Sequence, residues 1–150
     1  MKQVKKSVLL WYTPQEMYEL VTAVERYPEF LPWCQQVEVL DREATAVTAR
    51  LHLSYAGVRQ AFTTRNRNEP GQSVHMELVD GPFSKLDGLW QFMPLNKPGS
   101  DSTACKIAFE LNYAFSRGAL EAVVSPVFDR IANTFVDSFV QRAEMLYRAR

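Results

Sequence analysis

The chain has 150 residues, the usual length of one domain, so we expect residues 1–150 to fold as a single unit around one sizeable core. Its 17 Lys and Arg balance 17 Asp and Glu, so no net charge attracts it to DNA or to an anionic membrane, and any such contact must be a local patch. No apolar stretch approaches the about 20 residues of a membrane span, which predicts a soluble, cytoplasmic protein.

The two cysteines give no sign of a metal or disulfide framework. Cys34 and Cys105 are far apart in the chain, and neither belongs to a CxxC or Cys/His pattern. We interpret both as buried free thiols in a reducing compartment and expect no metal site.

The N-terminal segment predicts a strand followed by two short helices. Residues 3–11 read as the strand, and Thr13, Pro14 and Glu16 then form the signature of a helix start, with a capping box between Thr13 and Glu16. This helix should end before Pro28, because the residue ahead of a proline is disfavoured in the α conformation. A second helical turn is expected at 28–31.

Over residues 36–115 the apolar residues recur with a period of two, which indicates strands. The alternation is clearest over 46–55 and 105–115, with further strands expected at 59–67, 73–79 and 85–92. Short turns, such as the one at Gly81, favour antiparallel pairing. The side that faces water should carry mixed charges, namely Arg50, His52, Arg65, His75, Glu77, Lys106 and Glu110.

The C-terminus predicts the element that covers the other side of the sheet. Apolar residues recur at helical spacing from Phe128 to Tyr147, and Ser125 is the expected N-cap with Pro126 at the first helical position. A helix over 126–148 would be about 34 Å long, enough to cross the sheet.

These elements predict an α+β fold in which a curved antiparallel sheet of about seven strands wraps around one long helix. Such a helix cannot contact every part of the sheet, so an apolar cavity is expected between them. Most of the inward-facing residues should be ordinary core, but their aromatic content and the methionines Met76 and Met93 favour a pocket for an apolar guest. The expected lining is Phe30, Leu31, Trp33, Leu53, Tyr55, Phe62, Met76, Leu78, Trp90, Phe92, Phe109, Leu111, Tyr113, Phe128, Phe135 and Phe139.

Residues 25–34, ERYPEFLPWC, put Tyr27, Phe30, Leu31 and Trp33 on a segment bent by two prolines. Two interpretations remain open: the segment forms a lid or mouth over one end of the cavity, or it plugs the end of the core. If the apolar face of this segment is exposed, it would suit contact with a membrane surface or with a second copy of the chain.

Catalytic signatures are not found in the sequence. His52 and His75 fall on the water-facing side, Asp80 fits a turn, and the chain contains no GxSxG, HExxH, Walker or dinucleotide pattern. Arg65 and Arg67 fit a solvated strand end better than an RNA contact. We therefore expect no catalytic residues and no enzymatic activity.

Four segments carry a family resemblance: VERYPEFLPWC, GVRQAFTTRN, LVDGPFSKLDGLWQF and PVFDRIANTFVDSFVQRAEMLY. Together they resemble the coenzyme Q-binding START-domain family, whose bacterial members include ribosome association toxins. The resemblance implies a helix-grip (START-like) fold of the polyketide cyclase and lipid transport superfamily. It also implies a tunnel for a polyprenyl quinone such as ubiquinone, and a role in respiration. The chain starts directly at its first strand, as expected of bacterial rather than mitochondrial members.

Two hypotheses follow. The first is non-enzymatic binding of a polyprenyl quinone, with Tyr55, Trp90 and Tyr113 as candidate partners of the quinone head and a peripheral contact with the inner membrane. The alternative, implied by the resemblance to the toxins, is binding to the large ribosomal subunit that blocks subunit association. The candidate RNA contacts are Lys2, Lys5, Lys6, Arg65 and Arg67. A cyclase-like enzyme ranks third, because the sequence supplies no acid/base pair.

Overall fold

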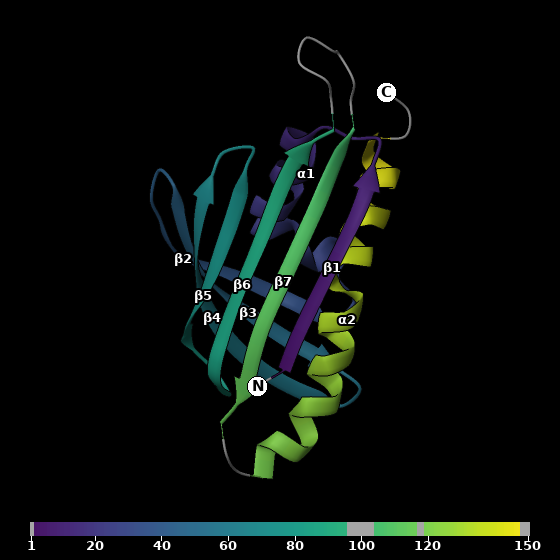
Figure 1. The fold of residues 1–150 in the computed structure, drawn as a ribbon. Helices are drawn as coiled ribbons and strands as arrows, with labels where there is room; N and C mark the ends of the chain where they lie inside the picture. The colour runs from purple at the N-terminus through teal and green to yellow at the C-terminus, as the bar shows by residue number, and fades with distance from the viewer. Residues whose placement is uncertain (1, 96–103, 117–118, 148–150) are drawn as a thin grey trace.

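The computed structural model describes residues 2–95, 104–116 and 119–147. Seven antiparallel strands form one sheet in the order β1-β7-β6-β5-β4-β3-β2. Figure 1 shows the sheet curving around one side of the long helix α2. The strands are β1 Lys2–Leu10, β2 Cys34–Arg42, β3 Ala46–Tyr55, β4 Val58–Glu69, β5 Ser73–Asp80, β6 Phe83–Pro94 and β7 Cys105–Phe115. The predicted fold class, an α+β helix-grip architecture, is confirmed.

Register shifts accompany the curvature of the sheet. The pairing of β2 with β3 shifts after Cys34 and again after Val39, and the pairing of β4 with β5 shifts after Thr63. A shift of this kind places two residues of one strand opposite one of its neighbour, which bends the strand and increases its twist. The sheet can therefore fold over the helix instead of lying flat against it.

The first helix, α1 Pro14–Thr22, begins as expected. The amide of Glu16 donates to Thr13 Oγ1 at 3.0 Å, and the amide of Thr13 donates to Glu16 Oε1 at 2.9 Å, which completes the predicted capping box. The helix ends at Thr22, before Pro28 as predicted, and its C-cap Ala23 has a ψ of 64° that departs from helical geometry.

The second short helix differs from the expectation of a turn at 28–31. It is a 3-10 helix, η1 Val24–Glu29, and Pro28 lies inside it. Residues three apart share one side of a 3-10 helix, so Val24 and Tyr27 point to the core together, at 2 % and 4 % exposure. Burial of this pair explains why the chain turns here despite the proline.

Helix α2 spans Ala119–Tyr147, so the predicted start at Pro126 is wrong. Ser125 is not an N-cap, because it lies within the helix and its hydroxyl accepts a 2.8 Å hydrogen bond from Lys2 Nζ. Pro126 removes one backbone donor, and the first turns of α2 lie at an angle to the rest (Figure 1). Buried Val124, at 1 % exposure, attaches the turn before the proline to the core. The predicted end at Arg148 is outside the described residues.

The two sides of the sheet divide as predicted. The inward side meets α1, η1 and α2 in one hydrophobic cluster, which includes both free cysteines. The outward side carries the expected charged residues, which are half-buried, and several of them pair across strands, as His52 does with Glu38. In the part of the chain that the structure describes, no helix is long and apolar enough to cross a membrane.

Candidate ligand-binding site

A cavity of about 60 Å³ lies between the sheet and α2. An engineered cavity of about 150 Å³ holds benzene, and typical ligand pockets measure about 300–1,000 Å³. The cavity is therefore a gap in the packing that a ligand must enlarge. Its lining is almost wholly apolar and consists of Val24, Tyr27, Trp33, Leu51, Phe62, Thr64, Asn66, Met76, Leu86, Phe109, Leu111, Phe128, Ile131, Ala132 and Phe135.

One row of paired residues forms a wall of the cavity. Asn66 of β4 pairs with Met76 of β5, which pairs with Gly88 of β6, which pairs with Leu111 of β7. A Cβ on Gly88 would lie 2.5 Å from Met76 Cε and 3.3 Å from Leu111 Cδ1. The glycine thus makes room for the Met76 side chain to lie across β6.

Two lining side chains are only half-buried, Met76 and Phe135, whereas the rest of the lining is buried. Methionine has three flexible torsions, and neither side chain is held as tightly as its neighbours. These two can change rotamer at the lowest cost in packing, so enlargement of the cavity should begin with them.

The structure brings together part of the lining expected from the sequence. The expected residues on the cavity wall are Trp33, Phe62, Met76, Phe109, Leu111, Phe128 and Phe135. The remaining expected residues lie elsewhere in the core or at its margin: Phe30, Leu31, Leu53, Tyr55, Leu78, Trp90, Phe92, Tyr113 and Phe139. Met93, also named with the pocket, is 36 % exposed. Contact between any of these residues and a ligand stays a prediction.

Aromatic packing explains why so many inward residues miss the cavity. The Trp90 ring lies 4.6 Å from Phe109, 5.1 Å from Phe139 and 5.7 Å from Phe135, measured between centroids. The pair with Phe139 is edge-to-face and the other two are tilted, and rings at these distances fill space as a protein interior does. One end of the interior is therefore solid, and the cavity lies beside it.

The segment at 25–34 closes one end of the core and also contributes to the cavity wall. Tyr27 and Trp33 line the cavity, while Leu31 is 1 % exposed and buried elsewhere. The segment is fastened to α2, because Arg142 bonds Glu29 at 2.7 Å and lies 5.2 Å from the Phe30 ring. Contact of this face with a membrane or a second copy required it to be exposed, and the structure buries Tyr27, Leu31 and Trp33 and leaves Phe30 half-buried. Membrane contact elsewhere stays a prediction.

None of the three residues expected to bind a quinone head lies on the cavity wall. Tyr113 is 2 % exposed, and its hydroxyl donates to Asp129 Oδ1 at 2.7 Å. Burial, together with the Asp129 carboxylate, raises the pKa of Tyr113 well above its usual value. Trp90 Nε1 is buried without a partner among the described residues, and Tyr55 is half-buried at the end of β3.

The polar part of the cavity is formed by Thr64 and Asn66, which the sequence analysis did not name. A signal for them exists in the strand pattern. If Arg65 and Arg67 face water on β4, the alternation places Thr64 and Asn66 inside, and polar residues at inward positions are unusual. The other lining residues outside the expected set are Val24, Tyr27, Leu51, Leu86, Ile131 and Ala132.

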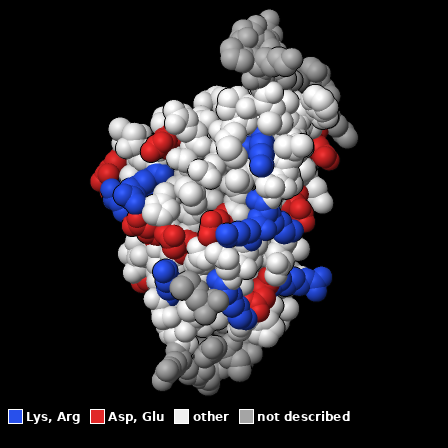
Figure 2. Space-filling model, viewed as in Figure 1, with Lys and Arg blue, Asp and Glu red and all other residues white. Residues whose placement is uncertain are grey.

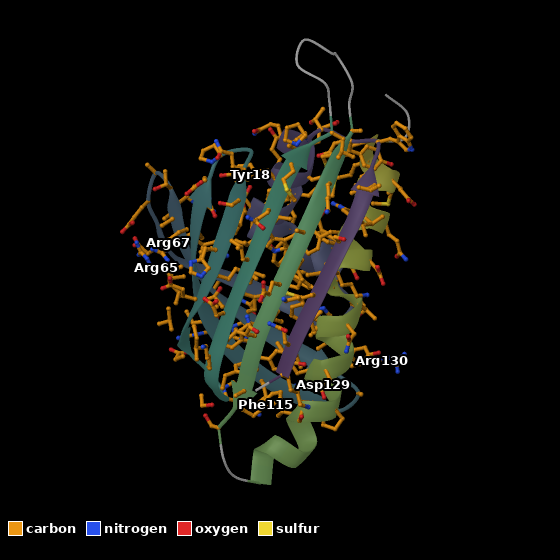
Figure 3. All side chains as sticks on the ribbon, viewed as in Figure 1. Tyr18, Arg65, Arg67, Phe115, Asp129 and Arg130 are labelled. Carbon is orange, nitrogen blue, oxygen red and sulfur yellow. The ribbon has the colours of Figure 1, made fainter. Side chains whose placement is uncertain are left out.

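The basic residues expected to contact RNA do not form one patch. Arg65 pairs with Glu43 at 3.1 Å, and Arg67 with Glu77. Lys6 lies 3.7 Å from Asp137. Figure 3 shows Arg65 and Arg67 together at one side of the sheet, away from β1, and Figure 2 shows both signs of charge interleaved over this face. Because β7, β6 and β5 separate β1 from β4, the two groups are about 19 Å apart.

A shallow groove of about 280 Å³ runs over the outer face beside β1. Lys5 and Lys6 line it, together with Leu89, Gln91 and Glu110 of the neighbouring strands. Lys5 is exposed and forms no ion pair within the described residues. Of the candidate RNA-contact residues, Lys5 is thus the one without an ion pair to the part of the chain that the structure describes.

The cavity is an apolar chamber with a small polar end under a helix, and the chain that forms it matches a known family. Residues 10–140 match the family of polyketide cyclase/dehydrase and lipid transport proteins. The chain belongs to this family. The recognition made from four segments of the sequence is confirmed.

Curated relatives within the family align over almost the whole chain. A ribosome association toxin RatA of Pseudomonas aeruginosa is 41% identical over 144 residues, which cover 96% of each chain. RatA of Escherichia coli K12 is 39% identical over 150 residues, 100% of this chain and 92% of the relative. A mitochondrial coenzyme Q-binding protein COQ10 homolog B of Xenopus laevis is 25% identical over 97% of this chain and 59% of its own.

Solved structures agree on the fold. The ZhuI aromatase/cyclase of a Streptomyces species superposes with a TM-score of 0.81 at 17% identity, over 99% of this chain and 96% of its own. A START superfamily protein of Mycobacterium smegmatis superposes with a TM-score of 0.77 at 17% identity, over 96% of this chain and 98% of its own. At these identities the likeness shows the family fold alone.

Proposed function

We propose that this protein binds, without chemical conversion, an apolar ligand of the polyprenyl quinone type in the cavity beneath α2. The observation that carries the proposal is the cavity itself, an apolar chamber lined by Phe62, Phe109 and Phe128 with one small polar end. The family's lipid transport members and the relative named a coenzyme Q-binding protein support the choice of ligand class.

The affinity of the protein for a polyprenyl quinone should come mainly from burial of the polyprenyl tail. Burial of apolar groups contributes about 0.8 kcal/mol per CH2, so about ten carbons contribute about 8 kcal/mol, against an association cost of about 4–15 kcal/mol. The cavity of about 60 Å³ must widen for this, beginning with Met76 and Phe135. We therefore expect binding to be slow compared with entry into an open pocket.

Lipid extraction tests the proposal directly. Protein purified from its host should yield a quinone on extraction. Ligand-free protein should bind added quinone with quenching of Trp33 and Trp90 fluorescence and a rise in melting temperature. If no quinone is extracted and added quinone changes neither signal, the proposal is wrong.

We also propose that the protein associates with the large ribosomal subunit. The support is the identity of 39–41% with proteins named ribosome association toxins, aligned from end to end. The groove beside β1 is the surface we assign, because Lys5 is exposed there and pairs with no carboxylate among the described residues. A phosphate contact through lysine should weaken steeply as salt rises.

Gradient sedimentation tests this association. The protein should migrate with large subunits at low salt and leave them at high salt. Lys5→Glu should reduce comigration, whereas Lys85→Glu, at an exposed position of β6 outside the groove lining, should not. Absence of comigration at low salt contradicts ribosome association, and equal behaviour of the two variants contradicts the choice of surface.

A further inference from the structure

The polar end of the cavity consists of two neighbouring side chains on the inward face of β4. Asn66 is 6 % exposed and Thr64 is 5 % exposed, and both line the cavity. The other lining side chains that carry a polar atom are Tyr27, whose hydroxyl donates to the backbone carbonyl of Val21, and Trp33, whose indole nitrogen can only donate. Thr64 and Asn66 are the two neighbouring polar side chains of the lining, and they lie together on β4.

The hydrogen bond between the two residues determines what they can offer a guest. Thr64 Oγ1 donates to Asn66 Oδ1 at 3.0 Å, so the amide oxygen is already engaged. The Asn66 amide nitrogen donates to no residue that the structure describes. The amide nitrogen is therefore available as a donor at the cavity wall, and a ligand oxygen that accepts from it gains a hydrogen bond.

The surroundings of Asn66 make this donor selective. Its ladder partner Met76 presents a flexible apolar side chain, and Gly88 beyond it contributes no side chain at all. No charged group is among the cavity-lining residues. A neutral acceptor such as a carbonyl oxygen can be desolvated here at modest cost, whereas a carboxylate or phosphate would be buried without a counter-ion.

We propose that Asn66, oriented by Thr64, donates a hydrogen bond to a carbonyl oxygen of the bound ligand and so places the carbonyl-bearing head against β4. The tail then lies along the apolar wall toward Phe135 and Trp33. This inference rests on the proposed ligand-binding function and adds to it the chemical class of the head and its direction in the cavity.

The test compares two ligands with the same tail. Decylubiquinone carries two ring carbonyls, and decylbenzene carries none. The affinity for the quinone is measured by tryptophan quenching, and that for decylbenzene by its displacement of the quinone. We expect the wild-type protein to prefer the quinone by about fivefold to tenfold, the effect of one neutral hydrogen bond. Asn66→Leu should abolish this preference and leave decylbenzene affinity within about twofold.

Two further variants keep the result interpretable. Met76→Leu changes the neighbouring lining residue without touching a polar atom, so the preference should persist. Thr64→Val keeps the shape of the side chain but removes the hydroxyl that orients the amide, so the preference should fall, by less than in Asn66→Leu. Infrared spectra of 13C-carbonyl quinone should show a carbonyl band at lower frequency in the wild type than in Asn66→Leu.

The outcomes separate the two proposals. If the wild type binds both ligands equally, or if Asn66→Leu and Thr64→Val leave preference and carbonyl band unchanged, the assignment of Asn66 is wrong and the ligand-binding function stands. If the wild type binds neither ligand, the proposed function itself fails, and this inference fails with it.

Discussion

Tyr113 of β7 and Asp129 of α2 join the sheet to the helix through a hydrogen bond of 2.7 Å. Lys2 of β1 pairs with the same carboxylate, so one aspartate connects two strands to α2. Figure 3 shows Asp129 beside the end of β7 that carries Phe115. The connection holds the helix against one side of the sheet, next to the cavity.

Removal of this carboxylate should destabilise the protein. In Asp129→Leu the buried Tyr113 hydroxyl loses its acceptor, and a buried polar group without a partner costs about 1–3 kcal/mol. Tyr113→Phe, which removes the donor and leaves Asp129 paired with Lys2, should cost about 1 kcal/mol. Urea unfolding measures both. Asp137→Leu is the control, since its 3.7 Å pair with Lys6 is exposed and should contribute less than about 1 kcal/mol.

Filling the cavity should stabilise the protein and block the ligand. Ala132 lines the cavity at 2 % exposure, and Ala132→Met places a flexible apolar side chain into the empty volume without loss of helix propensity. We expect a gain of about 0.5–2 kcal/mol in the free energy of unfolding. Quinone binding, followed by tryptophan quenching, should weaken.

The matched control for this change is Ala143→Met on the same helix. Ala143 is 0 % exposed and does not line the cavity, so a larger side chain there must displace packed neighbours. Overpacking of this kind costs about 1–3 kcal/mol. Equal stability changes at both positions would show that the volume beside Ala132 is not available.

Gly88→Ala tests the arrangement of the row Asn66, Met76, Gly88 and Leu111. The new Cβ would lie 2.5 Å from Met76 Cε, which is the end of a flexible chain and can move aside. We expect Met76 to turn into the cavity, with weaker quinone binding and a stability loss of about 1 kcal/mol. Shortening the methionine in Gly88→Ala/Met76→Ala should recover binding, since the two residues compete for the same space. An additive effect in this double-mutant cycle contradicts the arrangement.

The protein should lose stability in alkaline solution because of its buried thiols. Burial raises the pKa of Cys34 and of Cys105 from 9.0 to about 11. The folded state therefore keeps these protons at a pH where the unfolded chain loses them, so stability present below the unfolded pKa is lost as pH rises through the folded pKa. Between about pH 8 and about pH 10 the loss should be about 1 kcal/mol per thiol.

Unfolding in urea at several pH values measures this slope. The variant Cys34→Ala/Cys105→Ala has lower absolute stability but should show a shallower decline over the same range. Burial also raises the pKa values of Tyr27 and Tyr113, and the charge of Cys34 adds to the shift of Tyr27, so removal of Cys34 reduces the contribution of Tyr27 to the slope as well. Identical slopes in the two proteins would mean that the thiols are not the cause.

Local patterns in the sequence were sufficient for most of the fold. The alternation at 46–55 and 105–115 predicted β3 and β7, and the capping box at Thr13 and Glu16 predicted the start of α1. These predictions were correct because strand periodicity and helix capping depend on residues that are close together in the chain. The start of α2 was missed, since Pro126 resembles a first helical residue. The helix continues ahead of the proline, where Val124 is buried in the core and Ser125 accepts a hydrogen bond from Lys2, and neither contact is visible in the local sequence.

The candidate site was predictable only in part. A period-two pattern tells which side of the sheet a residue faces, and so Phe62, Phe109 and Leu111 were predicted to face inward, where they lie on the cavity wall. The same pattern cannot separate a residue on the wall of a cavity from one packed among aromatic rings, as Trp90 and Phe139 are.

The sequence by itself determined the family, through the resemblance of four segments to known proteins. It also determined the seven-stranded sheet with its covering helix and the division between an apolar interior and a charged exterior, because these follow from local periodicity and composition. Only the tertiary structure decided how large the cavity is and that Thr64 and Asn66 form its polar end. The physical reason is that empty volume is the small remainder left when side chains from distant strands and one helix pack together. No local stretch of sequence specifies that remainder.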